Sequence, residues 1–546
     1  MSSSIATPIV ESGADAGGEH RNRPDRITVG LTVALVCFGA YTIFAFPAHH
    51  DVAWMLYAAG KLLDGGRFGI DIVEVNPPLI VYFSAVVDTL ARALGVWNVT
   101  AWKGAVLVLA LTSLALCWKL LGVLLPHWPR ARGLLLLLLA FLLVPFAGME
   151  FGQREHLVLI LTMPYLIAAA GRARGLMIAR STAIFLGLLA GAGIALKPYF
   201  LPVWLGTEVY VGLRCGPRSW LRGEHAALVG ALVFYGLLVL LFTPDYVVVA
   251  RWALEVYDAY NSASPRWIAS QPGLRWALAA LTGSALAGVI VKRSALRELR
   301  WLTGISLLTY LAAVFAQNKG WAYHWLPVIA LSYLLLALSV LAASELLGDR
   351  RRGTGRVSRA LVQTRVPELV LALFLVLATA TILRSSRDHW SRMAGRSAYY
   401  LTAMIDLVET HGEEGPIFAF STNMQAGFPL VNLTGVDWGA RLNSLWHLPG
   451  LYAPTPPAQR GFAYRAPADM APIERAFFEA VITDLQHSRP TLLIVDTRPP
   501  GYVLNGFDYL EYFGQDGRFR ELMAGYRFLM PVDRYRVFKR IDEIQT

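Results

Sequence analysis

The sequence predicts a polytopic α-helical membrane protein that ends in a small α/β domain. Of its 546 residues, 55% are hydrophobic, and the mean hydropathy of +0.46 lies well above the balance of a soluble globular domain. Long apolar stretches recur through the first 384 residues and approach the length of about 20 residues that a helix needs to cross a bilayer. After Arg384, short apolar runs alternate with helical patterns, which is typical of an α/β unit.

The apolar stretches set the expected number of spans at about 11 to 13. They are 27–47, 79–95, 99–121, 132–147, 156–171, 181–196, 198–213, 226–243, 273–292, 301–316, 323–343 and 366–384. The stretch 79–95 follows two prolines and carries Asp88 and Arg92, so we interpret it as a helix at the membrane surface. Eleven spans remain. Residues 1–26 are polar and rich in Ser, Gly and Ala, which predicts a disordered cytoplasmic tail.

The charge distribution supports this topology, because loops on the cytoplasmic side concentrate Lys and Arg. With the N-terminus inside and eleven spans, the inside segments carry 21 Lys and Arg, and the outside segments of the membrane region carry 10. The net charge of +11 therefore follows from topology, and no nucleic acid partner is expected. We expect a multi-pass protein of the inner (cell) membrane with residues 385–546 on the periplasmic or extracellular side.

The C-terminal region contains no cysteine, so no disulfide framework is expected there. Its pattern predicts helices and strands in alternation. The helices are expected at 391–410, 472–487 and 509–524, and the strands at 416–420, 491–496, 526–532 and 535–539.

A distinctive stretch follows the first predicted span. It begins His49-His50-Asp51, continues as a helix-compatible run to Leu63 and a Gly-Gly turn, and ends Glu74-Val75-Asn76-Pro77-Pro78-Leu79. This stretch resembles the first exported loop of GT-C glycosyltransferases, a superfamily that includes protein O-mannosyltransferases and lipid A aminoarabinose transferases. GMEFGQREH at 148–156 resembles the second exported loop, and QNKGWAYHW at 317–325 a late phosphate-binding loop. The resemblance implies a GT-C-like catalytic domain at 27–384, with its first exported loop at 48–78, followed by an exported α/β domain.

Within this resemblance, Asp51 matches the catalytic aspartate. It would act as the general base that takes a proton from the acceptor hydroxyl as that oxygen attacks the anomeric carbon of the sugar. One displacement inverts that centre. The family's loop often opens on an acidic pair, whereas Asp51 is followed by Val52. The structural alternative is a surface carboxylate that caps the following helix.

Cations are expected to bind the phosphate of the donor, because the leaving group is anionic. The candidates are Arg154, Lys197, Lys319 and His324. The alternative to phosphate binding for Arg154 is a salt bridge with Glu150 or Glu155. For Lys319 it is the role of an interfacial anchor beside an aromatic belt. The candidates for binding substrate or acceptor are His50, Glu74, Asn76, Glu155 and Tyr323.

A divalent metal site is a further alternative, because imidazoles and carboxylates are suitable ligands. It would draw on His49, His50, Glu74, Glu155 and His156, but their spacing matches no diagnostic pattern. We therefore expect no metal and no cofactor. No Walker or dinucleotide-binding motif is present, which favours a lipid-linked sugar donor over a nucleotide sugar.

The function expected from these features is an inverting glycosyltransferase. It would move one sugar from a polyprenyl-phosphate carrier to a lipid, glycan or protein acceptor of the cell envelope. One alternative is a multi-pass lipid or sugar transporter or flippase without transferase chemistry. Transporters usually place ionisable groups near the middle of the bilayer, whereas here the spans carry few charges. Another alternative is a sensor or assembly protein whose α/β domain binds a ligand.

Overall fold

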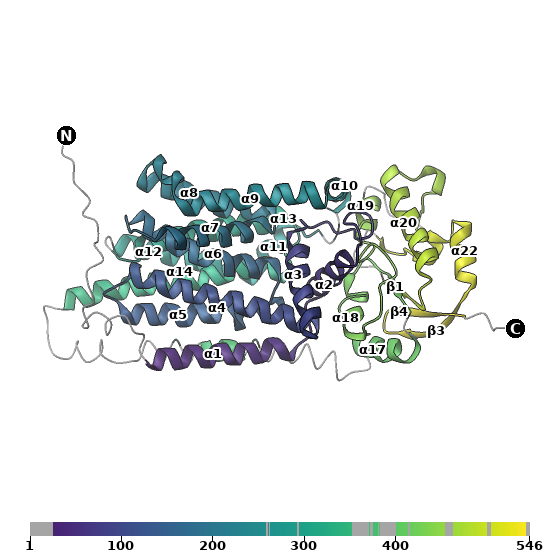
Figure 1. Cartoon of the computed structure of the whole chain (residues 1–546), viewed down its shortest axis with the longest axis horizontal. Helices are drawn as coiled ribbons and strands as arrows, with labels where there is room; N and C mark the ends of the chain where they lie inside the picture. Colours follow the sequence, from purple (N-terminus) through teal and green to yellow (C-terminus); the bar gives the residue numbers. More distant parts are fainter. Residues whose placement is uncertain are drawn as a thin grey trace.

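The computed structural model describes residues 26–541, apart from 258–259, 261, 292–293, 352–370, 372–374, 381, 383–399, 413–414, 454–461 and 499–503. A helical bundle forms one end of the molecule and an α/β region the other (Figure 1). The predicted tail, apart from Arg26, and most of the predicted span at 366–384 lie outside the described residues.

Long apolar helices make up the bundle. They are α1 (Arg26–Ala45), α4 (Asn98–Leu124), α5 (Pro129–Leu143), α6 (Arg154–Ala173), α7 (Arg180–Ala195), α8 (Leu201–Cys215), α9 (Gly223–Phe242), α12 (Pro272–Ile290), α13 (Arg297–Gln317) and α14 (Ala322–Arg351). Eight helices of the described chain are long and apolar enough to cross a membrane. The predicted spans at 181–196 and 198–213 correspond to α7 and α8, which have 16 and 15 residues. The predicted polytopic helical membrane fold is confirmed.

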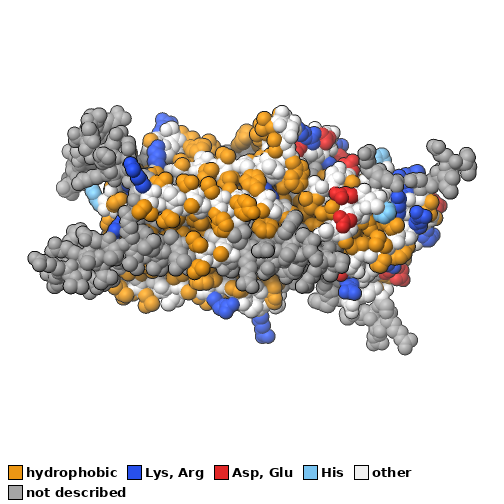
Figure 2. All heavy atoms as spheres, turned by 90° about the horizontal axis from the view of Figure 1, so that it is seen from below, with side chains coloured by type: hydrophobic (Ala, Val, Ile, Leu, Met, Phe, Trp, Pro, Cys, Tyr) orange, Lys and Arg blue, Asp and Glu red, His pale blue; other side chains and the backbone are white. Residues whose placement is uncertain are grey.

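The surface of the bundle is apolar, as expected of helices in contact with lipid. In α9 only Glu224 and Leu228 are buried, although the helix is among the most apolar in the chain. Figure 2 shows hydrophobic side chains over most of the described bundle surface, and acidic side chains at the end that carries the α/β region. Since lipid cannot hydrogen-bond backbone groups, such exposed apolar segments must be helices.

Four further helices lie near the end of the bundle that faces the α/β region (Figure 1). They are α2 (His50–Leu63), α3 (Leu79–Leu94), α10 (Tyr246–Trp252) and α11 (Pro265–Ser270). The predicted surface helix at 79–95 is α3, which begins after Pro78 and ends at Gly95 in the left-handed conformation. Arg92 of α3 bonds Asp88 at 2.8 Å and Asp64 at 2.6 Å, which ties α3 to the end of α2.

The α/β region contains a four-stranded sheet. Its strands are β1 (Ile417–Phe420), β2 (Leu492–Asp496), β3 (Tyr526–Val532) and β4 (Tyr535–Arg540), in the order β1-β2-β4-β3. β1 and β2 are parallel, and the other two pairs are antiparallel. The predicted strands are all found, and the helices of the region are α17 (Tyr400–His411), α18 (Leu430–Thr434), α19 (Leu448–Tyr452), α20 (Pro472–Ser488), α21 (Tyr509–Phe513) and α22 (Gly517–Ala524).

The single helix predicted at 509–524 is wrong, because the structure has two helices there. The first helix, α21, ends at Phe513, and Gly514 follows it. Asp516 then starts α22 as its N-cap, and its carboxylate accepts a hydrogen bond from the backbone of Arg518 at 2.8 Å. A capping carboxylate competes with continuation of the preceding helix, which explains the break.

The first loop of the chain packs directly on the α/β region. The backbone N–H of Trp438 donates to the hydroxyl of Tyr57 at 2.8 Å, and the amide of Asn432 donates to the carbonyl of Ala53 at 3.1 Å. Val73 forms a parallel bridge with Leu442. Residues 49–79 therefore lie between the bundle and the α/β region, and both contribute to the site described below.

Candidate active site

Asp51 lies in the first turn of α2, directly after the end of α1. His49 is the N-cap of α2, and its Nδ1 accepts a hydrogen bond from the backbone N–H of Asp51 at 3.2 Å. The carboxylate of Asp51 does not cap the helix, so the capping alternative is wrong. The residue is 9% exposed and its carboxylate faces other side chains.

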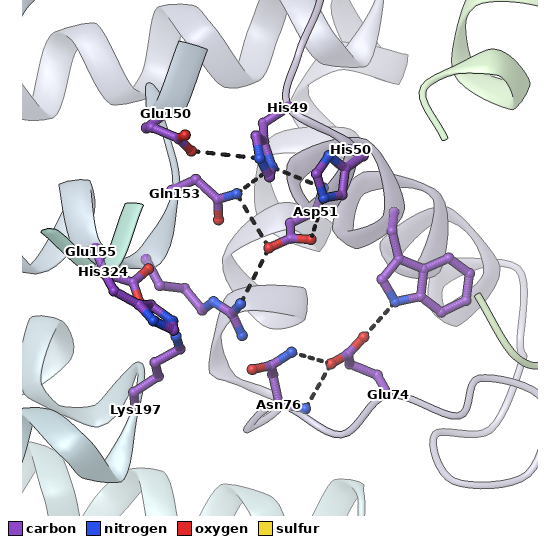
Figure 3. Close-up of polar contacts among 12 residues, drawn as sticks. His49, His50, Asp51, Glu74, Asn76, Glu150, Gln153, Glu155, Lys197 and His324 are labelled. Atoms are coloured by element: carbon purple, nitrogen blue, oxygen red, sulfur yellow. Dashed lines mark hydrogen bonds and ion pairs between the residues drawn. The ribbon is translucent and has the colours of Figure 1, made fainter. Parts of the chain in front are cut away.

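Three neighbours surround the carboxylate of Asp51 (Figure 3). Its Oδ1 lies 3.4 Å from His50 Nε2, and its Oδ2 accepts a hydrogen bond from Gln153 at 3.3 Å and lies 3.6 Å from Arg154 Nη2. Burial raises the pKa of Asp51, but His50, His49, Arg154 and the Gln153 hydrogen bond together lower it, and the net pKa lies below its usual range. Asp51 is therefore ionised at neutral pH.

A turn with two glycines brings Arg154 to this point. Gly148 and Gly152 have φ of 52° and 84°, a conformation that side chains disfavour, and the chain turns through them into α6. Gln153 is the N-cap of α6 and Arg154 its first residue. Arg154 is 3% exposed, and its Nη1 has no hydrogen-bond partner among the described residues. Its ion pair is with Asp51, so the alternative of a salt bridge with Glu150 or Glu155 is wrong.

Glu74 is fully buried and holds three segments together. Its Oε1 accepts from the backbone and side-chain nitrogens of Asn76, at 2.7 and 2.5 Å. Its Oε2 accepts from Trp54 Nε1 at 2.6 Å and from Asn443 Nδ2 at 3.3 Å. Burial raises the pKa of Glu74, although Arg154 and these hydrogen bonds oppose the change. The carboxylate thus joins α2, the first loop and the α/β region.

These residues meet at a cavity of about 330 Å³ between the bundle and the α/β region. Six of the predicted site residues line it, namely His50, Asp51, Glu74, Asn76, Arg154 and Tyr323. The other lining residues are His49, Met55, Val75, Glu150, Tyr257, Tyr260, Trp321, Ala322, Asn423, Met424, Gln425, Asn443, Ser444 and Trp446. A cavity of this size has room for a sugar-sized group.

Three other predicted site residues form a separate group that does not line the cavity (Figure 3). Lys197 Nζ bonds Glu155 Oε1 at 2.5 Å and Gln317 Oε1 at 3.1 Å, and His324 Nε2 lies 3.8 Å from the same carboxylate oxygen. Burial lowers the pKa of Lys197 to about 8. The ammonium group of Lys197 is thus neutralised by Glu155 of the protein itself.

Lys319 lies beside the cavity wall and does not line the cavity itself. It follows Asn318, a left-handed C-cap of α13, and its Nζ donates to the carbonyls of Tyr257 at 3.0 Å and Tyr260 at 2.6 Å. Tyr257 and Tyr260 do line the cavity. Lys319 therefore holds part of the wall in place.

The five residues of the predicted metal alternative do not gather at one point. Glu74 is fully hydrogen-bonded, Glu155 pairs with Lys197, and His156 accepts from the backbone of Gly152 at 3.1 Å. His49 and His50 instead come together with Asp51, with one ligand atom of each within 4.8 Å of the others. Two imidazoles and a carboxylate are a donor set that transition metals accept.

The sequence interpretation missed the contribution of the α/β region to the cavity. Asn423, Met424 and Gln425 follow β1, while Asn443, Ser444 and Trp446 lie in the segment that leads to α19. They lie more than 360 positions from Asp51 in the sequence. Uncharged polar residues in a loop carry no signal of their own, so only the folded chain reveals them.

Comparisons with known proteins agree with this architecture. No protein-family model matches the sequence. No curated protein matches it. Among solved structures, the chain is similar to ArnT from Cupriavidus metallidurans bound to undecaprenyl phosphate, with a TM-score of 0.53, 12% identity and coverage of 93% of this chain and 97% of that chain. It is also similar to the arabinofuranosyltransferase AftD from mycobacteria, with a TM-score of 0.45 and 15% identity, over 94% of this chain and 40% of that chain. The likeness to ArnT extends over both the bundle and the α/β region, and the chain thus shares the fold of that protein.

Proposed function

We propose that this protein is an inverting glycosyltransferase. It moves one sugar from a polyprenyl-phosphate carrier to a lipid, glycan or protein acceptor of the cell envelope. The observation that carries the proposal is the pairing of an ionised Asp51 with a buried, incompletely hydrogen-bonded Arg154 in one cavity. ArnT, whose fold the chain shares, was solved with undecaprenyl phosphate bound, which supports a lipid carrier.

Arg154 is the proposed ligand of the donor phosphate. A buried guanidinium nitrogen without a partner is costly, and a phosphate oxygen is a strong acceptor for it. Lys197 and Lys319 act at longer range, because both ammonium groups already donate to protein oxygens. His324 contributes through Glu155, which it approaches at 3.8 Å.

Asp51 is the proposed general base. A bond forms between the acceptor oxygen and the anomeric carbon as the bond from that carbon to the phosphate oxygen breaks. The acceptor proton passes to Asp51, and the polyprenyl phosphate leaves with the bonding electron pair. We propose that this single displacement needs no metal and no cofactor. His50, Asn76 and Tyr323 bind the substrates, while Glu74 positions Asn76 and Glu155 positions Lys197.

The low pKa of Asp51 has a consequence for this reaction. A carboxylate of low pKa is a weak proton acceptor. When the donor phosphate binds Arg154, its negative charge offsets the guanidinium, which together with His50 and His49 holds the pKa of Asp51 down. Donor binding therefore makes Asp51 a stronger base at the moment when the acceptor must be deprotonated.

Substitution of the base tests the assignment. Asp51→Asn keeps the size of the side chain and removes its capacity to accept a proton, so transfer should fall by roughly 100-fold to 10,000-fold. Transfer is measured by mass analysis of envelope lipids and glycans, with Asp88→Asn as a control, because Asp88 pairs with Arg92 away from the cavity. Full transfer by the purified Asp51→Asn protein would remove the base. Movement of lipid across the membrane without sugar transfer would favour the transporter alternative.

We also propose an orientation in the membrane. The N-terminus is cytoplasmic and the α/β region lies on the periplasmic or extracellular side. Cysteines introduced at Gly355 and at the exposed Asp437 in a background without Cys37, Cys117 and Cys215 should react with a membrane-impermeant thiol reagent from opposite sides. Labelling of both positions from one side contradicts the proposed topology.

A further inference from the structure

The α/β region contributes an uncharged wall to the cavity. We call this the polar wall and define it as Asn423, Gln425, Asn443, Ser444 and Trp446. Asn423 and Gln425 lie in the turn after β1, where the side chain of Asn423 accepts from the backbone of Gln425 at 3.0 Å. Asn443 is fixed by its hydrogen bond to Glu74, and Ser444 donates to Asn443 Oδ1 at 3.2 Å.

The polar wall differs chemically from the rest of the cavity lining. All charged residues that line the cavity come from the first loop, the second loop and its junction with α6. The polar wall offers amides and a hydroxyl, groups that both donate and accept hydrogen bonds. A sugar hydroxyl also does both, so the polar wall matches a polyhydroxylated ligand and not a fixed charge.

Trp446 adds an observation that points to a ligand. It is 3% exposed and lines the cavity, and its indole Nε1 has no hydrogen-bond partner among the described residues. A buried donor without an acceptor is unfavourable. Of the buried indoles in the described chain that lack such a partner, Trp446 is the one that lines this cavity.

Aromatic rings close the cavity beside the polar wall. The ring centroids of Tyr257 and Trp446 lie 5.6 Å apart, and those of Tyr260 and Trp321 lie 6.1 Å apart. Both tyrosines are held through their carbonyls by Lys319. Aromatic faces beside hydrogen-bonding groups suit a sugar ring, which has apolar C–H faces and polar edges.

We propose that the polar wall binds an uncharged sugar ring and sets the specificity of the transferase. The inference rests on the proposed function, because it assigns the sugar of that reaction to the part of the cavity lining that the α/β region provides. A charged sugar is disfavoured there, since none of the five wall side chains carries a charge that would neutralise it. The ring belongs either to the donor or to the acceptor, and the experiment distinguishes these sources.

The test uses the full-length protein in nanodiscs and four probes. Undecaprenyl phosphate reports binding of the phosphate alone, and undecaprenyl-phosphate mannose reports the added contribution of a neutral sugar. Octyl mannoside and octyl glucuronide represent a neutral and a charged acceptor. We expect the wild-type protein to bind undecaprenyl-phosphate mannose or octyl mannoside at least tenfold more tightly than undecaprenyl phosphate or octyl glucuronide, respectively.

Trp446→Phe removes the indole N–H and keeps an aromatic ring. Because that N–H has no partner among the residues that the structure describes, the thermal midpoint of the free protein should stay the same or rise, while the tenfold gain from the sugar should fall at least fivefold. Asn423→Ala provides a second variant with an intermediate degree of burial. Trp204→Phe is the matched control, since its Nε1 also lacks a described partner but it lies outside this cavity.

The outcomes separate this inference from the proposed function. A loss confined to undecaprenyl-phosphate mannose assigns the polar wall to the donor sugar, and a loss confined to octyl mannoside assigns it to the acceptor. No loss with either probe in Trp446→Phe and Asn423→Ala overturns the inference, even if undecaprenyl phosphate still binds through Arg154. Equal binding of octyl mannoside and octyl glucuronide, with no gain from mannose on the donor, overturns the preference for a neutral ring.

Discussion

Two arginines at opposite ends of the helical bundle, Arg154 buried and Arg222 partly buried, differ in which groups neutralise their charge. Arg222, the N-cap of α9, donates to Glu208 at 2.5 Å and to Glu224 at 2.9 Å. Helix α9 begins at the end of the bundle away from the α/β region (Figure 1). Arg154, at the start of α6, approaches Asp51 only to 3.6 Å and leaves Nη1 without a partner in the described chain. The guanidinium of Arg222 is therefore paired at short distance with two carboxylates, whereas that of Arg154 has one long ion pair and a nitrogen without a partner among the described residues.

The cavities near the two arginines also differ, in volume and in lining. The cavity next to Tyr165, which contacts Arg222, is apolar and has about 20 Å³, enough for a single water molecule. The cavity beside Arg154 has about 330 Å³. A buried charge whose partners are all in the protein stabilises a helix junction, while an incompletely paired charge at a cavity is available to a ligand.

Of the substitutions that test this comparison, Arg154→Gln should have the largest effect on transfer. Loss of the proposed phosphate ligand should lower transfer by about 100-fold to 1000-fold, because a positioned donor to the leaving group is removed. The thermal midpoint should change little, since the ion pair of Arg154 with Asp51 is long and Asp51 keeps Gln153 and His50 beside it. Binding of undecaprenyl phosphate in nanodiscs and the rate of transfer are the measurements. Unchanged binding and transfer would place Arg154 with Arg222 as a structural residue.

Arg222→Gln should give the opposite pattern. It leaves Glu208 and Glu224 buried with fewer partners, which should destabilise the protein by about 3 kcal/mol. Transfer per folded molecule should not change. Thermal unfolding, read beside activity normalised to folded protein, tests this, and a loss of activity in fully folded protein would contradict the distinction between the two ends.

Most of the fold could be predicted from the sequence, because apolar spans are long and helices and strands have periodic patterns. Spans follow from apolar length, and β1 and β2 from short apolar runs. The prediction of one helix at 509–524 was wrong, because the helical pattern of the sequence continues through a break that Gly514 and Asp516 impose. A local capping bond decided that boundary, and composition averaged over a window does not detect it.

The site was only partly readable. The sequence groups Asp51, Glu74 and Asn76 in one loop, and all three line the cavity. It does not separate Arg154 from Lys197, because both are cations near the ends of apolar stretches. Only the tertiary contact between Lys197 and Glu155 shows that one charge is met within the protein. The polar wall was unpredictable, since its residues come from a distant loop of the chain.

Glu74→Gln tests whether the cavity beside Arg154 depends on the hydrogen bonds of the buried Glu74. The substitution keeps the shape of the side chain but sets an NH₂ group against the N–H donors of Trp54 or Asn76. At least one hydrogen bond is lost, so stability should fall by about 1 to 3 kcal/mol. The thermal midpoint measures this, and Glu255→Gln is the control, because no ion pair or hydrogen bond of its side chain is found among the described residues. An unaltered midpoint would show that Glu74 does not join the three segments.

The smallest effect concerns pH and follows from the pairing of Asp51 with Arg154. In the free protein the pKa of Asp51 lies below its usual range, so Asp51 should impose no acid limb on kcat/KM above about pH 5. With donor phosphate on Arg154 the pKa rises, and protonation at low pH then removes the base. The acid limb of kcat should therefore lie at least about one pH unit above that of kcat/KM. In Arg154→Gln the positive charge is already absent from the free protein, so the acid limb of kcat/KM should move up and the two limbs should lie closer together than in the wild type. Profiles of wild type and Arg154→Gln over the same pH range decide between these outcomes: two limbs that coincide in the wild type would mean that the arginine does not link donor binding to the basicity of Asp51.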